Sequence, residues 1–273
     1  MRLYVFDLGS LTSDRNLMVS MSHIAKIDDP ECCNSLMEFP VPGFLIETEM
    51  GYILYDTGCH PDCMGENGRW PEAFQKQVYY RGDESNWIVT KLKQLGIKPE
   101  EIKTVVLSHM HNDHAGCIEY FPNAQFIVHR DEFDACIRCY ATHRYMDSYI
   151  WKDTDVWIRQ RHDWKFLENE DGDYELCPGV TILNLGAGHA RGVLGLLVEL
   201  EETGAVIVTS DAVYCSDNYE YEQAPGVIYD TLGWKRSLQR IKYIAKKKNA
   251  QVWFGHDRRQ FDQLKLAPEF FYE

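Results

Sequence analysis

Short runs of hydrophobic residues, separated by turns rich in Gly, Pro, Asn and Asp, recur along most of the chain. Apolar runs of about four to eight residues predict β-strands, whereas apolar residues spaced three or four apart predict amphipathic helices. The predicted strands cover residues 1–7, 44–49, 52–56, 105–108, 125–129, 180–185, 195–201, 205–210 and 251–254. Helices are predicted at 87–95 and 231–247, and another begins at Asp131. Strands and helices therefore alternate in one series, which indicates a mixed α/β fold.

Two stretches interrupt this series. Residues 59–86 are polar and aromatic, with Gly65, Gly68 and Pro71 as breakers, and residues 140–164 are rich in Tyr and Trp. Aromatic insertions of this kind commonly cover a pocket or form a subunit contact. The alternative is a peripheral helix whose aromatic side chains pack against the hydrophobic core. Because no low-complexity linker separates the segments, residues 1–273 are expected to form a single domain with these two insertions.

Charge and composition narrow the class of protein. The chain of 273 residues has a formal net charge of −14, which opposes binding to the phosphates of nucleic acids. No apolar run approaches the roughly 20 residues of a transmembrane helix, and the first residues lack the apolar core of a signal peptide. The nine cysteines show no disulfide framework, and Cys136 and Cys139 are expected to be structural. These features predict a cytoplasmic protein that binds neither nucleic acid nor membrane.

The segment SHMHNDH, residues 108–114, directly follows an apolar predicted strand. It places His109, His111, Asp113 and His114 on one short loop, and imidazole and carboxylate groups are common metal ligands. His109 and His111 share one side of an extended segment, because side chains repeat there every second residue. Asp113 and His114 turn away from that pair, so the loop is able to serve two adjacent metal ions. The alternative is a polar surface loop, which three histidines at this spacing disfavour.

Three further residues of the metal-ligand type also follow predicted strands. His189 lies in the segment LGAGHARG, Asp211 comes directly after strand 205–210, and His256 comes two residues after strand 251–254. Loops at strand ends are common places for functional sites. A dinuclear centre needs more ligands than one loop supplies, and these three residues are the candidates that complete it.

The full pattern resembles that of the metallo-β-lactamase superfamily: H-x-H-x-D-H, then a His in a Gly-His-x-x-Gly turn, then an Asp and a late His. The resemblance implies a four-layer αββα sandwich, an α/β (α+β) fold in which two mixed sheets pack face to face with helices outside. The ligand loops would meet at one edge of this sandwich.

The resemblance also implies two divalent metal ions and their ligands. One ion would be bound by His109, His111 and His189, the other by Asp113, His114 and His256, with Asp211 bridging the two. Asp56, in the segment DTG, matches a family motif beside the site and is expected to support a ligand. Nitrogen and oxygen donors suit zinc best, with iron, manganese and cobalt as alternatives.

Tyr214 lies three residues after Asp211, a spacing that resembles the N-acyl-homoserine lactone lactonases, the quorum-quenching branch of this superfamily. The segments FGHD, EFFY and LYVFDLGS resemble the same branch, and the last also resembles 4-pyridoxolactonase. The resemblance implies a hydrolase that opens the ring of N-acyl-homoserine lactones, or of a related small lactone, by attack of a metal-bridging hydroxide. Tyr214 would donate to the oxyanion and Asp113 would carry the proton to the leaving alkoxide. The alternative for Tyr214 is a buried core tyrosine.

Two residues depart from the lactonase pattern. Asn112 stands where a hydrophobic residue is frequent, and Arg191 falls in a segment that is usually of the Ser-Pro-Gly-His type. Both could alter the pocket wall, although Arg191 is expected to pair with a surface carboxylate. Other interpretations stay open: a 4-pyridoxolactonase-like enzyme, a glyoxalase-II-like thioesterase and a non-catalytic metal-binding protein. The expected partner is a small-molecule lactone, and a homodimer is left open.

Overall fold

The computed structural model of the chain describes residues 1–30, 35–144 and 148–273. Residues 145–147 of the second insertion lie outside this description. Among the described residues, seven strands form one mixed sheet in the order β4-β1-β2-β3-β5-β6-β7. Its strands are β1 (Arg2–Asp14), β2 (Leu36–Thr48), β3 (Gly51–Tyr55), β4 (Tyr79–Arg81), β5 (Ile102–Val106), β6 (Gln125–His129) and β7 (Asp163–Leu167). Strands β4, β1, β2 and β3 pair antiparallel, whereas β3, β5, β6 and β7 pair parallel.

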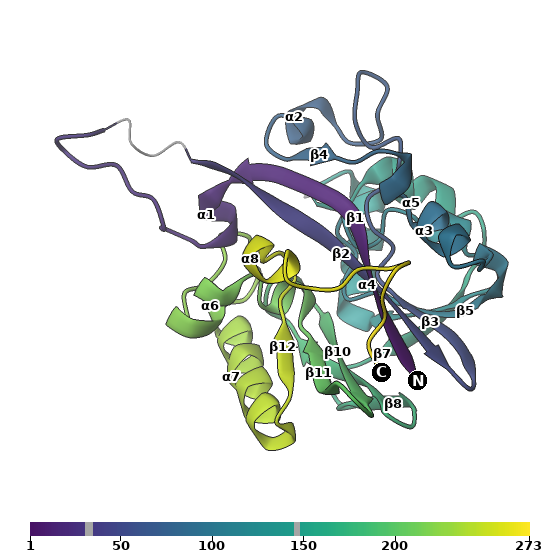
Figure 1. Cartoon of the computed structure of the whole chain (residues 1–273). Coiled ribbons are helices and arrows are strands. Elements are labelled where there is room, and N and C mark those ends of the chain that lie inside the picture. The colour runs from purple at the N-terminus through teal and green to yellow at the C-terminus, as the bar shows by residue number, and fades with distance from the viewer. Residues whose placement is uncertain (31–34, 145–147) are drawn as a thin grey trace.

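A second mixed sheet follows in the chain, with the order β12-β11-β10-β9-β8 among the described residues. Its strands are β8 (Tyr174–Cys177), β9 (Val180–Gly186), β10 (Val193–Leu200), β11 (Gly204–Val208) and β12 (Gln251–Trp253). Only the β11–β12 pair is parallel within this sheet as described. Figure 1 shows the two sheets facing each other, with both termini close together at one end.

The helices lie outside the sheets (Figure 1). The α-helices are α1 (Arg15–Met18), α2 (Glu72–Gln75), α3 (Ile88–Gln94), α4 (Arg130–Thr142), α5 (Trp151–Trp157), α6 (Ser216–Tyr221), α7 (Thr231–Lys248) and α8 (Arg258–Phe261). Short 3₁₀ turns are η1 (Glu84–Asn86), η2 (Pro99–Glu101), η3 (Ile118–Tyr120) and η4 (Ser210–Ala212). No helix in the described part of the chain is long and apolar enough to cross a membrane.

The side chains of each strand point alternately to the two faces of the sheet, and this divides the hydrophobic core into layers. On β1, Leu3 and Val5 face the second sheet, whereas Tyr4 and Phe6 belong to the layer on the opposite face, because neighbouring side chains of a strand point to opposite faces. The inter-sheet layer includes Leu196 of β10, and the opposite layer includes residues of α3 and α4. Each fully buried aliphatic side chain in these layers contributes about 1.5–3 kcal/mol.

The outer face of the second sheet is covered by α7. Trp234, Leu238 and Ile241 of this helix are buried against it. Asp230 caps the helix N-terminus by accepting from the backbone N–H of Leu232 at 3.0 Å, and Asn249 ends it with a left-handed φ of +50°, so both helix ends have the conformations that capping requires. Helices therefore cover both outer faces, and the predicted four-layer αββα sandwich is confirmed.

Most of the predicted strands and helices are present, with shifted ends. The strand predicted at 105–108 ends at Val106, because the backbone N–H of Ser108 leaves the sheet and donates to the Asp56 carboxylate at 2.7 Å. Strands β4, β7 and β8 were not predicted. Each is an edge strand with few buried residues, so it lacks the apolar run by which the inner strands were recognised.

Candidate metal centre

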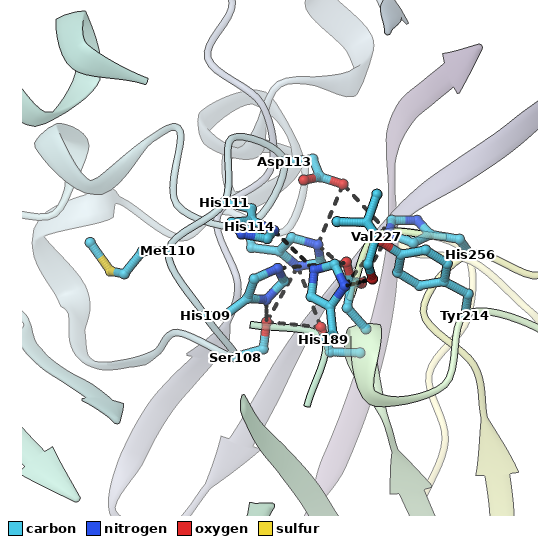
Figure 2. A network of polar contacts seen from close by, with 12 residues as sticks. Ser108, His109, Met110, His111, Asp113, His114, His189, Tyr214, Val227 and His256 are labelled. Atoms are coloured by element: carbon cyan, nitrogen blue, oxygen red, sulfur yellow. Dashed lines mark hydrogen bonds and ion pairs between the residues drawn. The ribbon is translucent and has the colours of Figure 1, made fainter. Parts of the chain in front are cut away.

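The candidate metal ligands meet at one edge of the sandwich, although they come from four separate loops. His109, His111, Asp113 and His114 follow β5, and His189 lies between β9 and β10. Asp211 lies in η4 directly after β11, and His256 follows β12. Figure 2 shows the rings of His109, His114 and His189 turned toward one another, with Asp113 on one side and His256 beside Tyr214.

The first cluster consists of His109, His111, His189 and Asp211, whose potential ligand atoms all lie within 4.8 Å of one another. The Nε2 atom of His189 is 2.9 Å from Nδ1 of His111 and 3.2 Å from Oδ2 of Asp211. Oδ2 of Asp211 is also 3.5 Å from Nε2 of His109. Four potential donor atoms therefore lie together, and these are the residues that the family resemblance assigns to one metal ion.

The second cluster consists of Asp113, His114 and His256, with their ligand atoms within the same 4.8 Å limit. Oδ2 of Asp113 is 3.4 Å from Nε2 of His114 and 3.5 Å from Nε2 of His256. The other carboxylate oxygen of Asp211, Oδ1, lies 3.3 Å from Nε2 of His114 and 3.0 Å from Nε2 of His256. Asp211 thus faces the first cluster with one oxygen and the second cluster with the other, which is the arrangement of a bridging carboxylate.

Several of these polar atoms are buried without a hydrogen-bond partner: Nε2 of His109, Nε2 of His114 and Oδ1 of Asp211. Buried polar atoms almost always have a partner, so unsatisfied atoms that point at one another require an explanation. A metal ion at each cluster satisfies them, and imidazole nitrogens with carboxylate oxygens are an ordinary donor set for such ions. The residues therefore fit a two-metal centre.

In two of the rings, Nδ1 donates to a backbone carbonyl. Nδ1 of His256 donates to the carbonyl of Pro40 at 2.8 Å, and Nδ1 of His189 donates to the carbonyl of Val227 at 3.0 Å. Because these nitrogens carry the proton, the Nε2 atoms keep a free lone pair for a metal ion. Sequence reasoning missed Pro40 and Val227, and no sequence signal could have found them, because any residue offers a backbone carbonyl.

Asp56 supports the loop that carries the first four ligands. One carboxylate oxygen accepts from the N–H of Ser108 at 2.7 Å, and the other is 2.8 Å from Nδ1 of His114. The backbone of Asp56 has a left-handed φ of +61°, a conformation that is rare for residues other than glycine. The structure therefore places Asp56 next to a candidate ligand, as the sequence predicted.

The local electrostatics favour neutral histidines in the first cluster. Burial lowers the pKa of His111 to about 3 and lowers the pKa values of His109 and His189 below the ordinary range, aided in His109 by neighbouring imidazoles. The neutral ring is the form that binds metals. Burial would raise the pKa of Asp211, but the surrounding histidines outweigh it and hold that pKa well below its usual value. Asp211, which lies between the two clusters, is thus a carboxylate anion.

Tyr214 lies at the same site, with its hydroxyl 3.2 Å from Nδ1 of His189. Burial raises the pKa of Tyr214 well above its ordinary value, and the negative charges of Asp211 and Asp113 raise it further. The phenol therefore stays protonated. The N–H at Nδ1 of His189 is shared between the Val227 carbonyl and the Tyr214 oxygen, so the phenol keeps its own proton for another acceptor.

A cavity of about 290 Å³ opens onto both clusters. Its wall includes four candidate ligands together with Tyr214, and the remaining lining residues are Leu11, Leu17, Met18, Phe39, Phe74, Gln77, Val78, Asn112, Ser148 and Val227. Residues 74–78 belong to the first insertion and Ser148 to the second. Both insertions therefore contribute to the pocket, and the second also packs the Trp157 ring against Phe133 and Trp164.

The two residues that depart from the lactonase pattern have different environments. Asn112 lies in the cavity wall, and its Nδ2 atom is buried without a hydrogen-bond partner. The guanidinium of Arg191 lies 4.5 Å from the centre of the Tyr229 ring, and no carboxylate of the described residues is within ion-pair distance of it. The carboxylate partner predicted for Arg191 is therefore not found among the described residues, where the face of the Tyr229 ring supplies a favourable contact for the cation.

Close packing around Gly255 leads to a prediction. A Cβ at this position would lie 2.6 Å from the carbonyl of Ser210 and 3.1 Å from Oδ1 of Asp211. We expect Gly255→Ala to reduce the free energy of unfolding by about 1–3 kcal/mol, as overpacking does, and to weaken metal binding by displacing Asp211. Urea denaturation and metal content measure the two effects.

Gly204→Ala is the control for this substitution. Gly204 has a φ of +81° but nothing within 4 Å of an added Cβ, so Ala there costs only the backbone strain of about 1–2 kcal/mol. Metal content should be unchanged. Equal metal content in both variants would contradict the steric argument for Gly255.

Comparison with known proteins agrees with this geometry. The family model described as the metallo-beta-lactamase superfamily matches residues 37–256. An N-acyl homoserine lactonase, AiiB of Agrobacterium fabrum, is 41% identical over 273 residues, covering 100% of this chain and 99% of the relative. An N-acyl homoserine lactonase of Bacillus cereus is 34% identical over 237 residues, covering 86% of this chain and 88% of the relative.

A solved structure is similar along the whole chain. It is the crystal structure of a mutant of B. thuringiensis AiiA with N-decanoyl-L-homoserine bound at the active site. The TM-score is 0.82 and the sequence identity 30%, and the match covers 100% of this chain and 98% of that one.

Proposed function

The chain belongs to the metallo-β-lactamase superfamily, and from this we propose that it is a metal-dependent hydrolase that opens the lactone ring of N-acyl-homoserine lactones. The observation that carries this proposal is the convergence of both ligand clusters on Asp211, at the wall of a cavity that also contains Tyr214. The relatives that are similar over nearly the whole chain are named N-acyl homoserine lactonases, which supports this substrate class.

The metal assignment is part of this proposal. His109, His111 and His189 would hold one divalent ion, Asp113, His114 and His256 the other, and Asp211 would bridge them. When bound, the two ions supply Lewis acidity to the lactone carbonyl and acidify the attacking water. Zinc suits these nitrogen and oxygen donors, and iron, manganese and cobalt are the alternatives.

Tyr214 and Asp113 are the proposed catalytic residues. The protonated phenol of Tyr214 faces the cavity and would donate a hydrogen bond to the carbonyl oxygen as negative charge develops on it. The carboxylate of Asp113 also lines the cavity, and its pKa is lowered because His114 and His256 outweigh the effect of burial. As an anion it would take the proton of the attacking water and pass it to the ring oxygen when the ester bond breaks. Ring opening would yield an N-acyl-homoserine.

The cavity lining supports an acyl chain as the rest of the substrate. Aliphatic and aromatic side chains, such as Leu11, Phe39 and Phe74, make up much of its wall. None of the described residues that line it is a lysine or an arginine, so a glutathione-type anion would find no cationic partner there. This composition disfavours the glyoxalase-II-like thioesterase, and no feature of the cavity favours a pyridoxolactone over an acylated lactone.

Three broader predictions remain proposals. We propose a cytoplasmic location, which the buried thiols outside disulfides support, Cys59, Cys117 and Cys136 among them. We propose that residues 1–273 form one domain, because both sheets share the core layer between them. A homodimer through the second insertion is proposed from the part-exposed ring of Trp151, and gel filtration would test it.

The proposed function is tested by ring opening of N-acyl-homoserine lactones with short and long acyl chains by zinc-loaded protein. We expect rapid, metal-dependent hydrolysis that chelation abolishes, and the chain-length trend would measure how far the cavity admits an acyl chain. Metal-loaded protein that opens none of these lactones would contradict the proposal and would direct attention to thioesters and pyridoxolactone.

A further inference from the structure

Glu132 is a carboxylate that lies fully buried in the first turn of α4, beside the metal centre. Its two oxygens have different partners on two separate loops. Oε1 accepts from the backbone N–H of Met110 at 3.1 Å, and Oε2 accepts from the backbone N–H of Arg191 at 2.9 Å. One side chain therefore joins the loop after β5 to the loop between β9 and β10.

These two loops carry all three histidines of the first cluster. Met110 lies between His109 and His111 in the chain, and Arg191 lies two residues after His189. Glu132 bonds the peptide backbone beside these ligands and no ligand side chain. The second cluster is supported elsewhere, since Asp56 contacts His114 and the carbonyl of Pro40 contacts His256. Glu132 thus bonds the backbone beside the ligands of the first cluster, whereas Asp56 and the carbonyl of Pro40 contact ligand rings of the second cluster.

The topology explains why Glu132 reaches both loops. Strands β5 and β6 are parallel neighbours, so both end at the edge of the sheet where the ligands lie. Helix α4 begins directly after β6, and His129 caps it by accepting from the N–H of Asp131 at 3.2 Å. The first turn of α4, with Glu132, is thereby placed under the ligand loops. Sequence reasoning predicted this helix but missed Glu132, because acidic residues are common in the first turn of helices.

The second insertion contributes to the same arrangement. The side chain of Tyr149 favours the charged form of Glu132, and its ring lies 5.2 Å from the ring of His111. Burial raises the pKa of Glu132 to about 7, against the lowering effect of the N–H groups of Met110, Arg191 and Gly192. Burying this carboxyl is therefore unfavourable by itself, and its hydrogen bonds to the two loops must offset that cost.

We propose that Glu132 is a positioning residue for one of the two metal sites. By accepting from both backbones it fixes the distance between the His109–His111 loop and the His189 loop, and so holds three imidazoles at the spacing that one ion requires. The inference rests on the metal ligands of the proposed function, but not on the identity of the substrate.

The test is Glu132→Gln, which keeps the shape of the side chain but turns an NH₂ group toward one of the two backbone donors. We expect the affinity of the His109–His111–His189 site for zinc to fall about 10- to 100-fold, as when hydrogen-bond partners of ligands are lost, with the other site unchanged. Competition with a chromophoric chelator measures the affinities. Anomalous scattering from crystals of the zinc-loaded protein gives the occupancy of each site.

Asp56→Asn is the matched variant, because Asp56 is also a buried carboxylate that accepts from the backbone of the same loop. Its contact with His114 predicts the opposite pattern, with zinc lost first from the Asp113–His114–His256 site. If Glu132→Gln does not fold, Glu132→Asp keeps both oxygens at a shorter reach, and the same selective loss is expected from it.

Equal loss from both sites in a folded Glu132 variant, or no loss from either, would overturn the inference. Selective loss from the His109–His111–His189 site supports it, even if no lactone is hydrolysed. Wild-type protein that binds no zinc would overturn both this inference and the metal assignment on which it rests.

Discussion

Replacing Asp211 by asparagine is expected to lower kcat for lactone opening by at least about 1000-fold. The two carboxylate oxygens face different clusters, with Oδ2 3.2 Å from His189 and Oδ1 3.0 Å from His256. The asparagine amide keeps one oxygen for one cluster. Toward the other cluster it turns an NH₂ group, which cannot bind a metal. The loss of one metal removes several kcal/mol of charge stabilisation in the transition state, and each 1.36 kcal/mol corresponds to a factor of ten.

Metal content and steady-state kinetics together check this prediction. The folded Asp211→Asn protein should contain fewer than two equivalents of metal after dialysis against a weak chelator. Asp262→Asn is the control, since this exposed carboxylate pairs, among the described residues, with Arg258 in the neighbouring helix turn, and the variant should retain full activity and metal. An Asp211→Asn protein with full metal content and undiminished kcat would contradict the bridging role.

Replacing Tyr214 by phenylalanine is expected to lower kcat by about 100-fold, with metal content unchanged and little change in KM. The ring packs at 5.1 Å from that of His256 and would remain in place, so only the hydroxyl is lost. That hydroxyl keeps its proton because its pKa is raised, and it faces the cavity where the carbonyl oxygen would lie. Removal of one hydrogen-bond donor to the oxyanion commonly lowers kcat by about 100-fold or more.

The control for this variant is Tyr219→Phe. Tyr219 lies on α6, where its ring packs against Phe254, and it is not among the residues that line the cavity. We expect no change in kcat from this substitution. If Tyr214→Phe kept the kcat of the wild type, Tyr214 would be a buried core tyrosine, which is the alternative that the sequence left open.

Much of the site could be predicted from the sequence because its signals are local. Four of the candidate ligands lie within six residues, and His189, Asp211 and His256 each follow an apolar strand. The order of these segments carries the family resemblance, and the αββα layers follow from the alternation of strands and helices. Edge strands such as β7 and β8 were not predicted, because their exposed residues weaken the hydrophobic pattern in the sequence.

Contacts between distant segments could not be predicted in the same way. The partners of the ligand rings include the carbonyls of Pro40 and Val227, which have no residue-type signal. The contact of Arg191 with the ring of Tyr229 was not predicted, because the fold brings that ring to it from a loop 38 residues away. Glu132 gave no signal either, since it joins the loops of Met110 and Arg191 through their backbone N–H groups, and these loops meet only in the folded chain.

The sequence by itself therefore determined which residue types the candidate metal centre contains, because metal ligation depends on residue type and the candidate ligands lie in short motifs at strand ends. The family resemblance already implied how the donors are divided between two clusters, and the tertiary structure supplied the distances, with one oxygen of Asp211 facing each cluster. Only the tertiary structure decided which groups hold the ligands in place and which side chains line the cavity. These properties depend on distances between segments far apart in the chain, and such distances are fixed only when the two sheets pack together.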